Sequence, residues 1–244
     1  MSTHLYDLAP TTRFTDRAES YALGRPSYAP AAIARILDGL SSPRVLDAGA
    51  GTGIATRLLT QAGARVIAFD PNYAMAAASG RHVSALARAE EIPFPDSTFD
   101  VVTVFNAFHW MRPDRALPEM RRVLRGAGRL ALVWNGWEET HDGTAAFVRI
   151  LNAFAGDHPP ENRAMEVAPL YASEAFSDVV CHSFPYVHTL DRDTLMLRVQ
   201  SISYLPAHGE VITRVQEYFE RYAVQSAVQH HYVTTAFVAK RAAA

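Results

Sequence analysis

Cysteine is almost absent from this sequence: Cys181 is the single one among 244 residues. One cysteine cannot build an internal disulfide framework, nor a zinc cluster that needs several thiolates. The sequence also has no excess of positive charge, because 25 acidic residues face 23 Lys and Arg residues for a net charge of −2. Nucleic acid as the main partner is therefore disfavoured, since neutralising phosphates requires a clustered basic face.

Long hydrophobic runs are missing as well. No apolar run approaches the roughly 18 residues needed to cross a bilayer, and residues 1–7 do not follow the basic, apolar and small-residue order of a signal peptide. The histidines form no His-x3-His or His-x-His pair beside an acid, so we expect no metal site. We expect a cytoplasmic protein without a membrane partner.

The sequence does contain enough apolar residues, 49%, for a substantial core. Apolar runs alternate with helix-compatible segments, which indicates an α/β domain with a parallel sheet covered on both faces. Ligands bind such sheets beyond the carboxyl ends of the strands. The strands are expected at residues 44–48, 65–70, 82–88, 98–106, 129–134, 179–187 and 232–240, and the helices at 14–21, 31–40, 54–61, 72–79, 114–124, 144–154, 191–204 and 212–228.

The most informative stretch is Asp47-Ala-Gly-Ala-Gly-Thr-Gly53, between the first strand and the following helix. Glycines let the backbone N–H groups of such a turn approach a ligand. The dinucleotide fingerprint would need a third glycine at position 54, where this chain has Ile54. Asp47 suits a ligand with a cationic or hydrogen-donating end, although a Gly-rich turn without a ligand is the alternative.

A second acid, Asp70, ends the second predicted strand. It can accept charge-assisted hydrogen bonds from both hydroxyls of a ribose, and a helix N-cap or turn acid is the alternative reading. A ribose is common to several cofactors, so Asp70 alone does not choose among them. Met75 falls one turn into the next helix, where it suits an adenine face or simply the core.

Further segments follow these motifs in a recognisable order: 89–100, Phe105-Asn-Ala-Phe-His-Trp110, 117–124, 126–135 and, at the N-terminus, Tyr21 with Gly24-Arg-Pro-Ser-Tyr28. Together with 47–53 and Asp70 they resemble class I S-adenosylmethionine (SAM)-dependent methyltransferases of the small-molecule branch, and most closely the trans-aconitate methyltransferase-like proteins. The resemblance implies a Rossmann-like methyltransferase fold: a mostly parallel seven-stranded sheet with helices on both faces and a helical lid. It implies one domain over 1–244, with a SAM-binding core at 14–135 and lid or acceptor-binding elements at 1–30 and about 136–230.

The resemblance also implies which residues contact SAM. Arg25 is expected to pair with the methionine carboxylate, or else to be an exposed arginine in a turn. Arg88 departs from the pattern, since many relatives have an acid there that receives the adenine amino group; a backbone acceptor or Glu90 is the candidate replacement. The full set expected to bind the cofactor is Tyr21, Arg25, Asp47, Gly49, Ala50, Gly51, Asp70, Pro71, Met75, Ala89, Glu90, Asn106 and Ala107.

His109 and Tyr28 are the candidate catalytic residues. An unperturbed histidine titrates near neutrality, so His109 is predicted to orient or deprotonate an acceptor oxygen, with a purely structural hydrogen bond as the alternative. Tyr28 is a candidate proton acceptor or relay. The expected reaction is methyl transfer from SAM to a small-molecule acceptor, favouring oxygen as a carboxylate, phenol or enol.

Three rival functions remain open. A protein of this fold can bind SAM and catalyse a cyclisation or rearrangement without methyl transfer. A NAD-dependent oxidoreductase is disfavoured by Asp47 and Ile54. A non-catalytic scaffold is disfavoured because a degenerate site has no reason to retain a buried acid. The protein is expected to be a monomer or homodimer.

Overall fold

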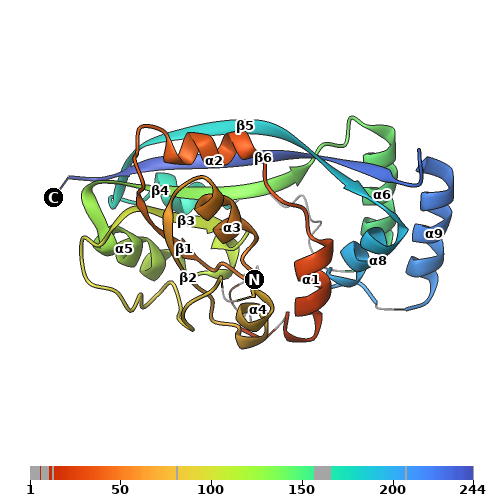
Figure 1. Ribbon diagram of the computed structural model, residues 1–244, viewed down its shortest axis with the longest axis horizontal. Coiled ribbons are helices and arrows are strands. Elements are labelled where there is room, and N and C mark those ends of the chain that lie inside the picture. The colour runs from red at the N-terminus through yellow and green to blue at the C-terminus, as the bar shows by residue number, and fades with distance from the viewer. Residues whose placement is uncertain are drawn as a thin grey trace.

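A six-stranded mixed sheet organises the computed structural model, which describes residues 6, 11–12, 14–80, 82–156, 166–206 and 208–243 (Figure 1). The spatial order is β2-β1-β3-β4-β6-β5. The pairs β1–β2, β1–β3 and β3–β4 are parallel, whereas β6 is antiparallel to both β4 and β5. The strands are β1 (Arg44–Ala48), β2 (Arg65–Phe69), β3 (Phe99–Phe105), β4 (Leu124–Trp137), β5 (Phe176–Leu190) and β6 (Val228–Arg241).

The sheet of the described residues has six strands rather than the seven expected, because the predicted strand at 82–88 is wrong. This segment makes one isolated parallel bridge, between Phe69 and Ala85, supported by a bond from the Ser84 N–H to the Ala68 carbonyl. Its composition explains the difference, since alanine has little preference for strands and the run has a single β-branched residue, Val83, against four in β3. The antiparallel addition of β5 and β6 makes the sheet mixed.

The helices begin and end close to the predicted residues in most cases. Pro30 opens α2 at its first turn, as expected from its fixed φ. The predicted helix at 212–228 is wrong beyond Tyr222, because Gln225 and Ser226 adopt positive φ in a tight turn that leads into β6. The helices are α1 (Ala18–Gly24), α2 (Pro30–Leu37), α3 (Ile54–Gln61), α4 (Tyr73–Ala78), α5 (Pro113–Val123), α6 (Asp142–Ala153), α7 (Ala168–Tyr171), α8 (Arg192–Gln200) and α9 (Glu210–Tyr222), with 3-10 turns η2 (Thr15–Arg17) and η3 (Phe108–Trp110).

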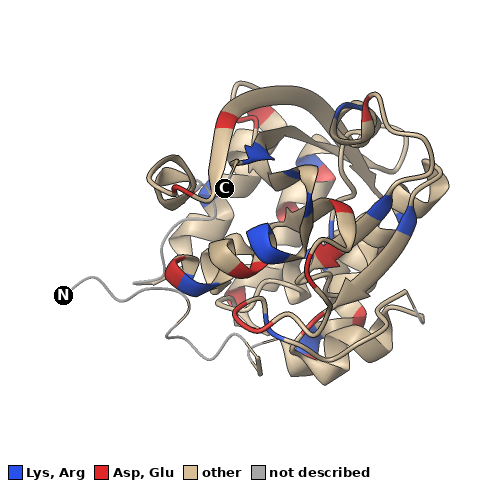
Figure 2. Cartoon of the chain, turned by 90° about the vertical axis from the view of Figure 1, so that its left-hand side faces the viewer, with Lys and Arg blue, Asp and Glu red and all other residues tan. Residues whose placement is uncertain are grey.

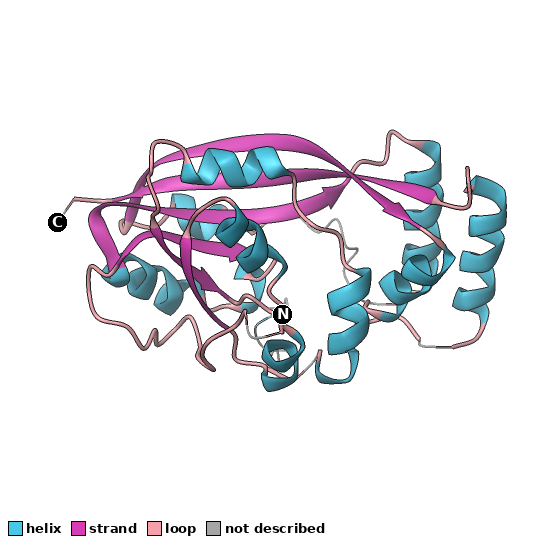
Figure 3. Ribbon diagram, viewed as in Figure 1, coloured by secondary structure: helices cyan, strands magenta, loops and turns pink. Residues whose placement is uncertain are grey.

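Helices cover both faces of the sheet, as predicted. One core contains Ile36 of α2 and Leu59 of α3, and another contains Leu117 of α5 and Leu170 of α7. A third core lies where β4, β5 and β6 extend past the short parallel strands to meet α6, α8 and α9 (Figure 3). Burying an aromatic such as Trp137 there removes a large apolar area from water.

The N-terminal segment crosses from this third core to the carboxyl ends of the parallel strands. α1 packs so tightly against α8 that a methyl group at Gly24 would overlap the backbone of Leu197 and Arg198. The Arg17 guanidinium donates hydrogen bonds to the carbonyls of Ile202 at 2.6 Å and Leu205 at 3.1 Å. Parts of the lid elements expected at 1–30 and about 136–230 lie outside the described residues. The described part of the N-terminal element lies over the edge of the sheet where ligands are expected.

Candidate functional site

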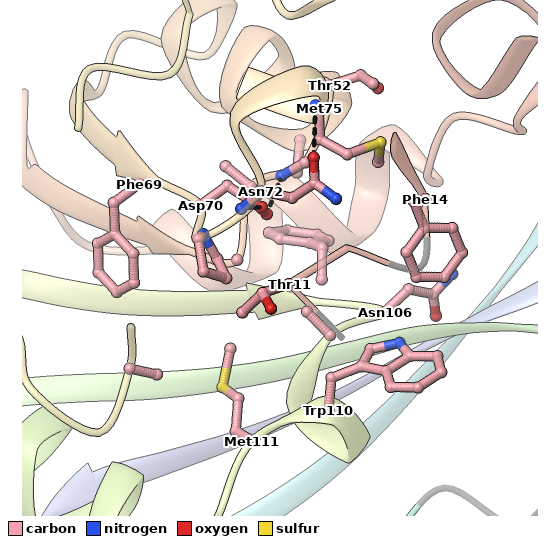
Figure 4. Close-up of a pocket in the computed structure, with 18 of the residues that line it drawn as sticks. Thr11, Phe14, Thr52, Phe69, Asp70, Asn72, Met75, Asn106, Trp110 and Met111 are labelled. Carbon is pink, nitrogen blue, oxygen red and sulfur yellow. Dashed lines mark hydrogen bonds between the residues drawn. The ribbon is translucent and has the colours of Figure 1, made fainter. Parts of the chain in front are cut away.

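A cleft opens at the carboxyl ends of β1, β2 and β3, where the parallel arrangement predicts a ligand site (Figure 4). It holds about 930 Å³ of empty space, part of it open to solvent. Eleven of the thirteen residues expected to bind the cofactor line the cleft, and so does one of the two catalytic candidates. The predicted residues that line it are Tyr21, Tyr28, Gly49, Ala50, Gly51, Asp70, Pro71, Met75, Ala89, Glu90, Asn106 and Ala107, while Arg25, Asp47 and His109 do not.

The glycines between β1 and α3 keep this cleft open. Gly49 and Gly51 have φ values of +71° and +55°, which favour glycine. A methyl group on Gly49 would lie 2.9 Å from the Ala107 side chain, and one on Gly51 would lie 3.2 Å from the Met75 terminal methyl. The turn's own N–H groups are used internally, however: those of Gly49 and Ala50 bind the Phe69 carbonyl at 2.9 and 3.0 Å. Glycine is thus needed here for space and backbone shape more than for N–H groups aimed at a ligand.

Asp70 is fixed at the end of β2 with its carboxylate on the cleft. Its two oxygens accept the N–H groups of Gly51 and Asn72, each at 2.8 Å. Burial raises the pKa of Asp70, and these hydrogen bonds oppose the shift. A carboxylate has about four lone-pair sites, so the group can still accept the ribose hydroxyls of a nucleoside. The N-cap of α4 is Asn72, which accepts from the Met75 N–H at 3.1 Å, so the cap reading of Asp70 is wrong.

Asp47 lies behind the cleft rather than on it. It is fully buried and accepts hydrogen bonds from the hydroxyls of Thr56 at 2.6 Å and Thr103 at 3.0 Å. Burial raises its pKa to about 6, the two hydroxyls oppose the shift, and Asp70 adds to it. Asp47 is therefore a buried acid behind the cleft, held by two threonines that do not line the cleft either.

Arg25 also lies outside the cleft lining, on the far side of Tyr21. Its guanidinium carbon is 4.7 Å from the centre of the Tyr21 ring, and one Nη donates to the Ser201 carbonyl at 3.0 Å. Arg25 thus joins α1 to the segment that follows α8. Direct pairing with the methionine carboxylate would require this arrangement to change.

His109 is placed beside Trp134 and is not part of the lining. Its Nδ1 accepts a hydrogen bond from the indole Nε1 of Trp134 at 3.4 Å, which leaves the proton on Nε2. Burial lowers its pKa to about 4, so the imidazole is neutral at physiological pH. The neighbouring Trp110 lines the cleft instead.

Tyr28 lines the cleft with its ring centre 4.7 Å from that of Phe105. Burial raises its pKa well above the usual value for a phenol, and the fields of Tyr21 and Asp47 add to this. The hydroxyl therefore keeps its proton near neutral pH and offers a hydrogen-bond donor, not a phenolate base.

The opposite end of the cleft carries Met75, Ala89 and the pair formed by Arg88 and Glu90. Met75 is 5% exposed and belongs to the cleft wall rather than to a closed core. Arg88 Nε lies 3.6 Å from Glu90 Oε2, and Glu90 Oε1 accepts the Arg112 N–H at 2.8 Å. Glu90 is thus held on the cleft wall by the Arg112 N–H and Arg88.

Several lining residues were missed from the sequence. Phe14 packs edge-on against Trp110 and Tyr21, with ring centres 5.7 and 5.9 Å apart, and closes one side of the cleft. Asn72 had a readable signal, because an Asn before an Ala-rich helix is a favoured N-cap. Nothing local marks Phe14 as a cleft residue, since one of its two ring contacts, Trp110, lies almost a hundred residues away.

The surroundings of the cleft carry few further signals. Within the described ranges, no group of three or more His, Cys, Asp and Glu side chains could hold a metal ion. Of the helices that the structure describes, none has the length and apolar character to cross a membrane. Acidic and basic residues are interspersed over the face shown in Figure 2.

Comparison with known proteins agrees with this geometry. The family described as a methyltransferase domain matches residues 46–132. An uncharacterized methyltransferase of Mycobacterium tuberculosis is 40% identical over 195 residues, covering 78% of this chain and 76% of that protein. The malonyl-[acyl-carrier protein] O-methyltransferase of Herminiimonas arsenicoxydans is 29% identical over 177 residues, covering 70% of this chain and 67% of that protein.

The fold is shared with solved structures as well. A protein described as a type II methyltransferase from Anaeromyxobacter dehalogenans matches with a TM-score of 0.69 at 22% identity, covering 89% of this chain and 97% of that one. The glycine turn, the fixed Asp70 and the length of the match to curated relatives lead to one assignment. The chain belongs to the class I SAM-dependent methyltransferases, it is an enzyme of that kind, and its cofactor is SAM.

Proposed function

We propose that the enzyme transfers the methyl group of SAM to an oxygen of a small organic acceptor, and that this oxygen belongs to a carboxylate. SAM supplies an activated methyl sulfonium, so the protein must mainly align the acceptor and exclude water. In-line approach at near-attack distance supplies several kcal/mol. A carboxylate is already deprotonated at neutral pH and needs no base.

The observation that supports a carboxylate acceptor is the set of ionisable side chains on the described cleft wall. Asp70 is bonded to Gly51 and Asn72, and Glu90 is bonded to Arg112 and faces Arg88, so both acids are engaged at the nucleoside end. A phenol or enol acceptor would need a base at the opposite end. Apart from Asp70, Glu90 and the cation Arg88, the described lining offers the aromatic rings of Phe14, Tyr21 and Trp110 and the neutral donors Tyr28 and Asn106.

Two similarities support an oxygen acceptor. The relative from Herminiimonas arsenicoxydans is named an O-methyltransferase of a malonyl group. The segment Phe105–Trp110 resembles trans-aconitate methyltransferase-like proteins, whose named substrate is a carboxylic acid. Both point to a carboxylate in place of a phenol.

We assign the cofactor along the cleft by chemistry. Asp70 accepts the ribose hydroxyls; Met75, Pro71 and Ala89 contact the base, with Glu90 receiving its amino group. The methionine end lies between the glycine turn and Asn106–Ala107. The N-terminal segment with Phe14 and Tyr21 acts as the lid that excludes water from the reacting atoms.

The test is an incubation of the enzyme with SAM and pairs of acceptors that differ only in carboxylic acid against phenol. We expect S-adenosylhomocysteine and a methyl ester to form in equal amounts with the acids, measured by mass spectrometry. Mild alkali should release methanol from this product, whereas an aryl methyl ether is stable. An alkali-stable product would refute the carboxylate, and acceptor conversion without S-adenosylhomocysteine would indicate cyclisation or rearrangement instead.

A further inference from the structure

Two residues on the long strands, the half-buried Asn135 of β4 and Thr234 of β6, form a hydrogen-bonded pair. They face each other in the antiparallel register, and the Thr234 hydroxyl donates to Asn135 Oδ1 at 2.6 Å. Thr234 is fully buried. Buried polar side chains persist where their hydrogen bonds are satisfied and fix one arrangement.

This pair holds the backbone on both sides of Tyr28. Asn135 Nδ2 donates to the Ser27 carbonyl at 2.7 Å, and the Ala29 N–H donates to the Thr234 hydroxyl oxygen at 3.1 Å. The residues before and after Tyr28 are thus attached to the same two side chains. Tyr28 lines the cleft between these two attachments, so the pair sets where its hydroxyl lies.

The same pair orients Asn106. The Asn135 backbone N–H donates to Asn106 Oδ1 at 3.2 Å, and the Asn106 N–H donates to the Val133 carbonyl at 2.8 Å. Because its oxygen is directed to β4, the amide of Asn106 presents its NH₂ group on the other side, and Asn106 lines the cleft (Figure 4). Asn106 has a φ of +47°, a conformation that Asn and Asp adopt more readily than other side chains and that is often retained at functional sites.

The cleft therefore has two neutral donors, the Asn106 amide and the Tyr28 hydroxyl. The hydrogen-bonded pair of Asn135 and Thr234 holds the Asn106 side chain and the backbone on both sides of Tyr28. Asn106 follows β3 and Tyr28 packs on Phe105 at the end of that strand, two strands away from β2 and Asp70 in the sheet. We place the methionine part of SAM on this side of the cleft. Its carboxylate needs donors, and Arg25 is turned to Ser201 while the Gly49 and Ala50 N–H groups bind Phe69. The positive charge of Arg25 lowers the pKa of the Tyr28 hydroxyl, but the larger effects of burial, Tyr21 and Asp47 raise it, so the hydroxyl remains a neutral donor.

We propose that the Asn106 amide and the Tyr28 hydroxyl bind the methionine carboxylate of SAM, and that Asn135 and Thr234 are positioning residues for both donors. This assignment concerns the cofactor alone, so it holds or fails independently of the acceptor proposed above.

The test compares two ligands that differ only in the carboxylate, S-adenosylhomocysteine and its decarboxylated analogue, by isothermal titration calorimetry on the full chain. Asn106→Asp keeps the size, the backbone preference and an oxygen for the Asn135 N–H, but replaces the donor by a negative charge. We expect this variant to bind S-adenosylhomocysteine at least about ten-fold more weakly, as for a lost hydrogen bond to a charged group. Its affinity for the decarboxylated analogue should stay within about two-fold of the wild-type value. Tyr28→Phe should weaken the first ligand selectively by several-fold.

The positioning pair is tested with Thr234→Val, which keeps the shape and removes the hydroxyl, and with Thr234→Ser, which restores it. We expect Thr234→Val to bind the carboxylate-bearing ligand with less preference over the analogue, and Thr234→Ser to recover that preference. Thr235→Val is the matched control, since that neighbouring hydroxyl lies 3.4 Å from Ser183 on β5 instead. Equal weakening of both ligands would show a merely structural role, and an unchanged preference in Asn106→Asp would overturn the proposal. If Thr234→Val fails to fold, Asn106→Asp and Tyr28→Phe still decide it.

Discussion

Replacing the buried Asp47 by asparagine should make the protein more stable at neutral pH. Burial raises the pKa of Asp47 to about 6, against about 3.9 for an exposed aspartate. A shift of two pKa units corresponds to about 3 kcal/mol between the protonation states, so the ionised side chain costs the folded protein about that much above pH 6. Asparagine removes this cost, and the hydroxyls of Thr56 and Thr103 can rotate to donate to or accept from its amide.

The difference in stability between Asp47→Asn and the wild type should depend on pH. Since the folded pKa lies above the unfolded one, the folded state binds more protons between pH 4 and 6, and its stability relative to the variant falls as pH rises through that window. Asp47→Asn should therefore unfold at a temperature roughly 6–12 °C higher than the wild type at pH 7.5, and the difference should vanish near pH 4. Thermal unfolding of both proteins from pH 4 to 8 measures it.

The same substitution should weaken cofactor binding, because a buried negative charge beside the methionine end favours the cationic groups of SAM. A variant that is more stable but binds its ligand more weakly is the expected trade-off at a functional site. Calorimetry with SAM would show the loss. A wild type more stable than the variant at pH 7.5, or a difference independent of pH, would refute the reasoning.

Three further predictions address single contacts. Asp70→Asn should lower the affinity for S-adenosylhomocysteine more than ten-fold, measured by calorimetry, since each hydrogen bond to a charged acceptor contributes about 1.5–3 kcal/mol. The control Glu91→Gln, at an exposed position, should leave this affinity unchanged. Gly24→Ala should lower the melting temperature by several degrees because the methyl group overlaps the backbone of α8, whereas Gly136→Ala, with no atom within 4 Å of the added carbon, should cost far less. With a pKa of about 4, His109 stays neutral over pH 6–9, so His109→Phe should leave the shape of the kcat/KM profile in that range unchanged; loss of a titration there would contradict this.

The parallel core of the fold was predictable because its signals are local. The apolar runs of β1 and β3, the glycines at 49, 51 and 53, and Pro30 each restrict the backbone by their own side chains or lack of them. The segment at 82–88 was mispredicted because its few β-forming residues suffice for one bridge, not a strand. The helix expected to 228 was mispredicted because the turn at Gln225 and Ser226 contains no glycine to announce it.

The gathering of Asp70, Ala89 and Glu90 on one cleft was also predictable. Asp70 ends a strand and Ala89 and Glu90 follow in a recognisable segment, so chain order alone brings them to one edge of a parallel sheet. The glycine turn follows for the same reason. Each of these residues lies within a few positions of a strand end, and the strand fixes its direction.

The sequence by itself determined the family, the cofactor and the edge of the sheet where the cleft opens, because strand order and glycine placement are encoded over short stretches of chain. Tertiary structure decided which side chains face the cleft. Asp47 and Arg25 turn away from it, and Asn106 turns toward it because a strand pair about 30 and 130 residues later holds its oxygen. Side-chain direction depends on packing partners distant in sequence, and no local pattern carries that information.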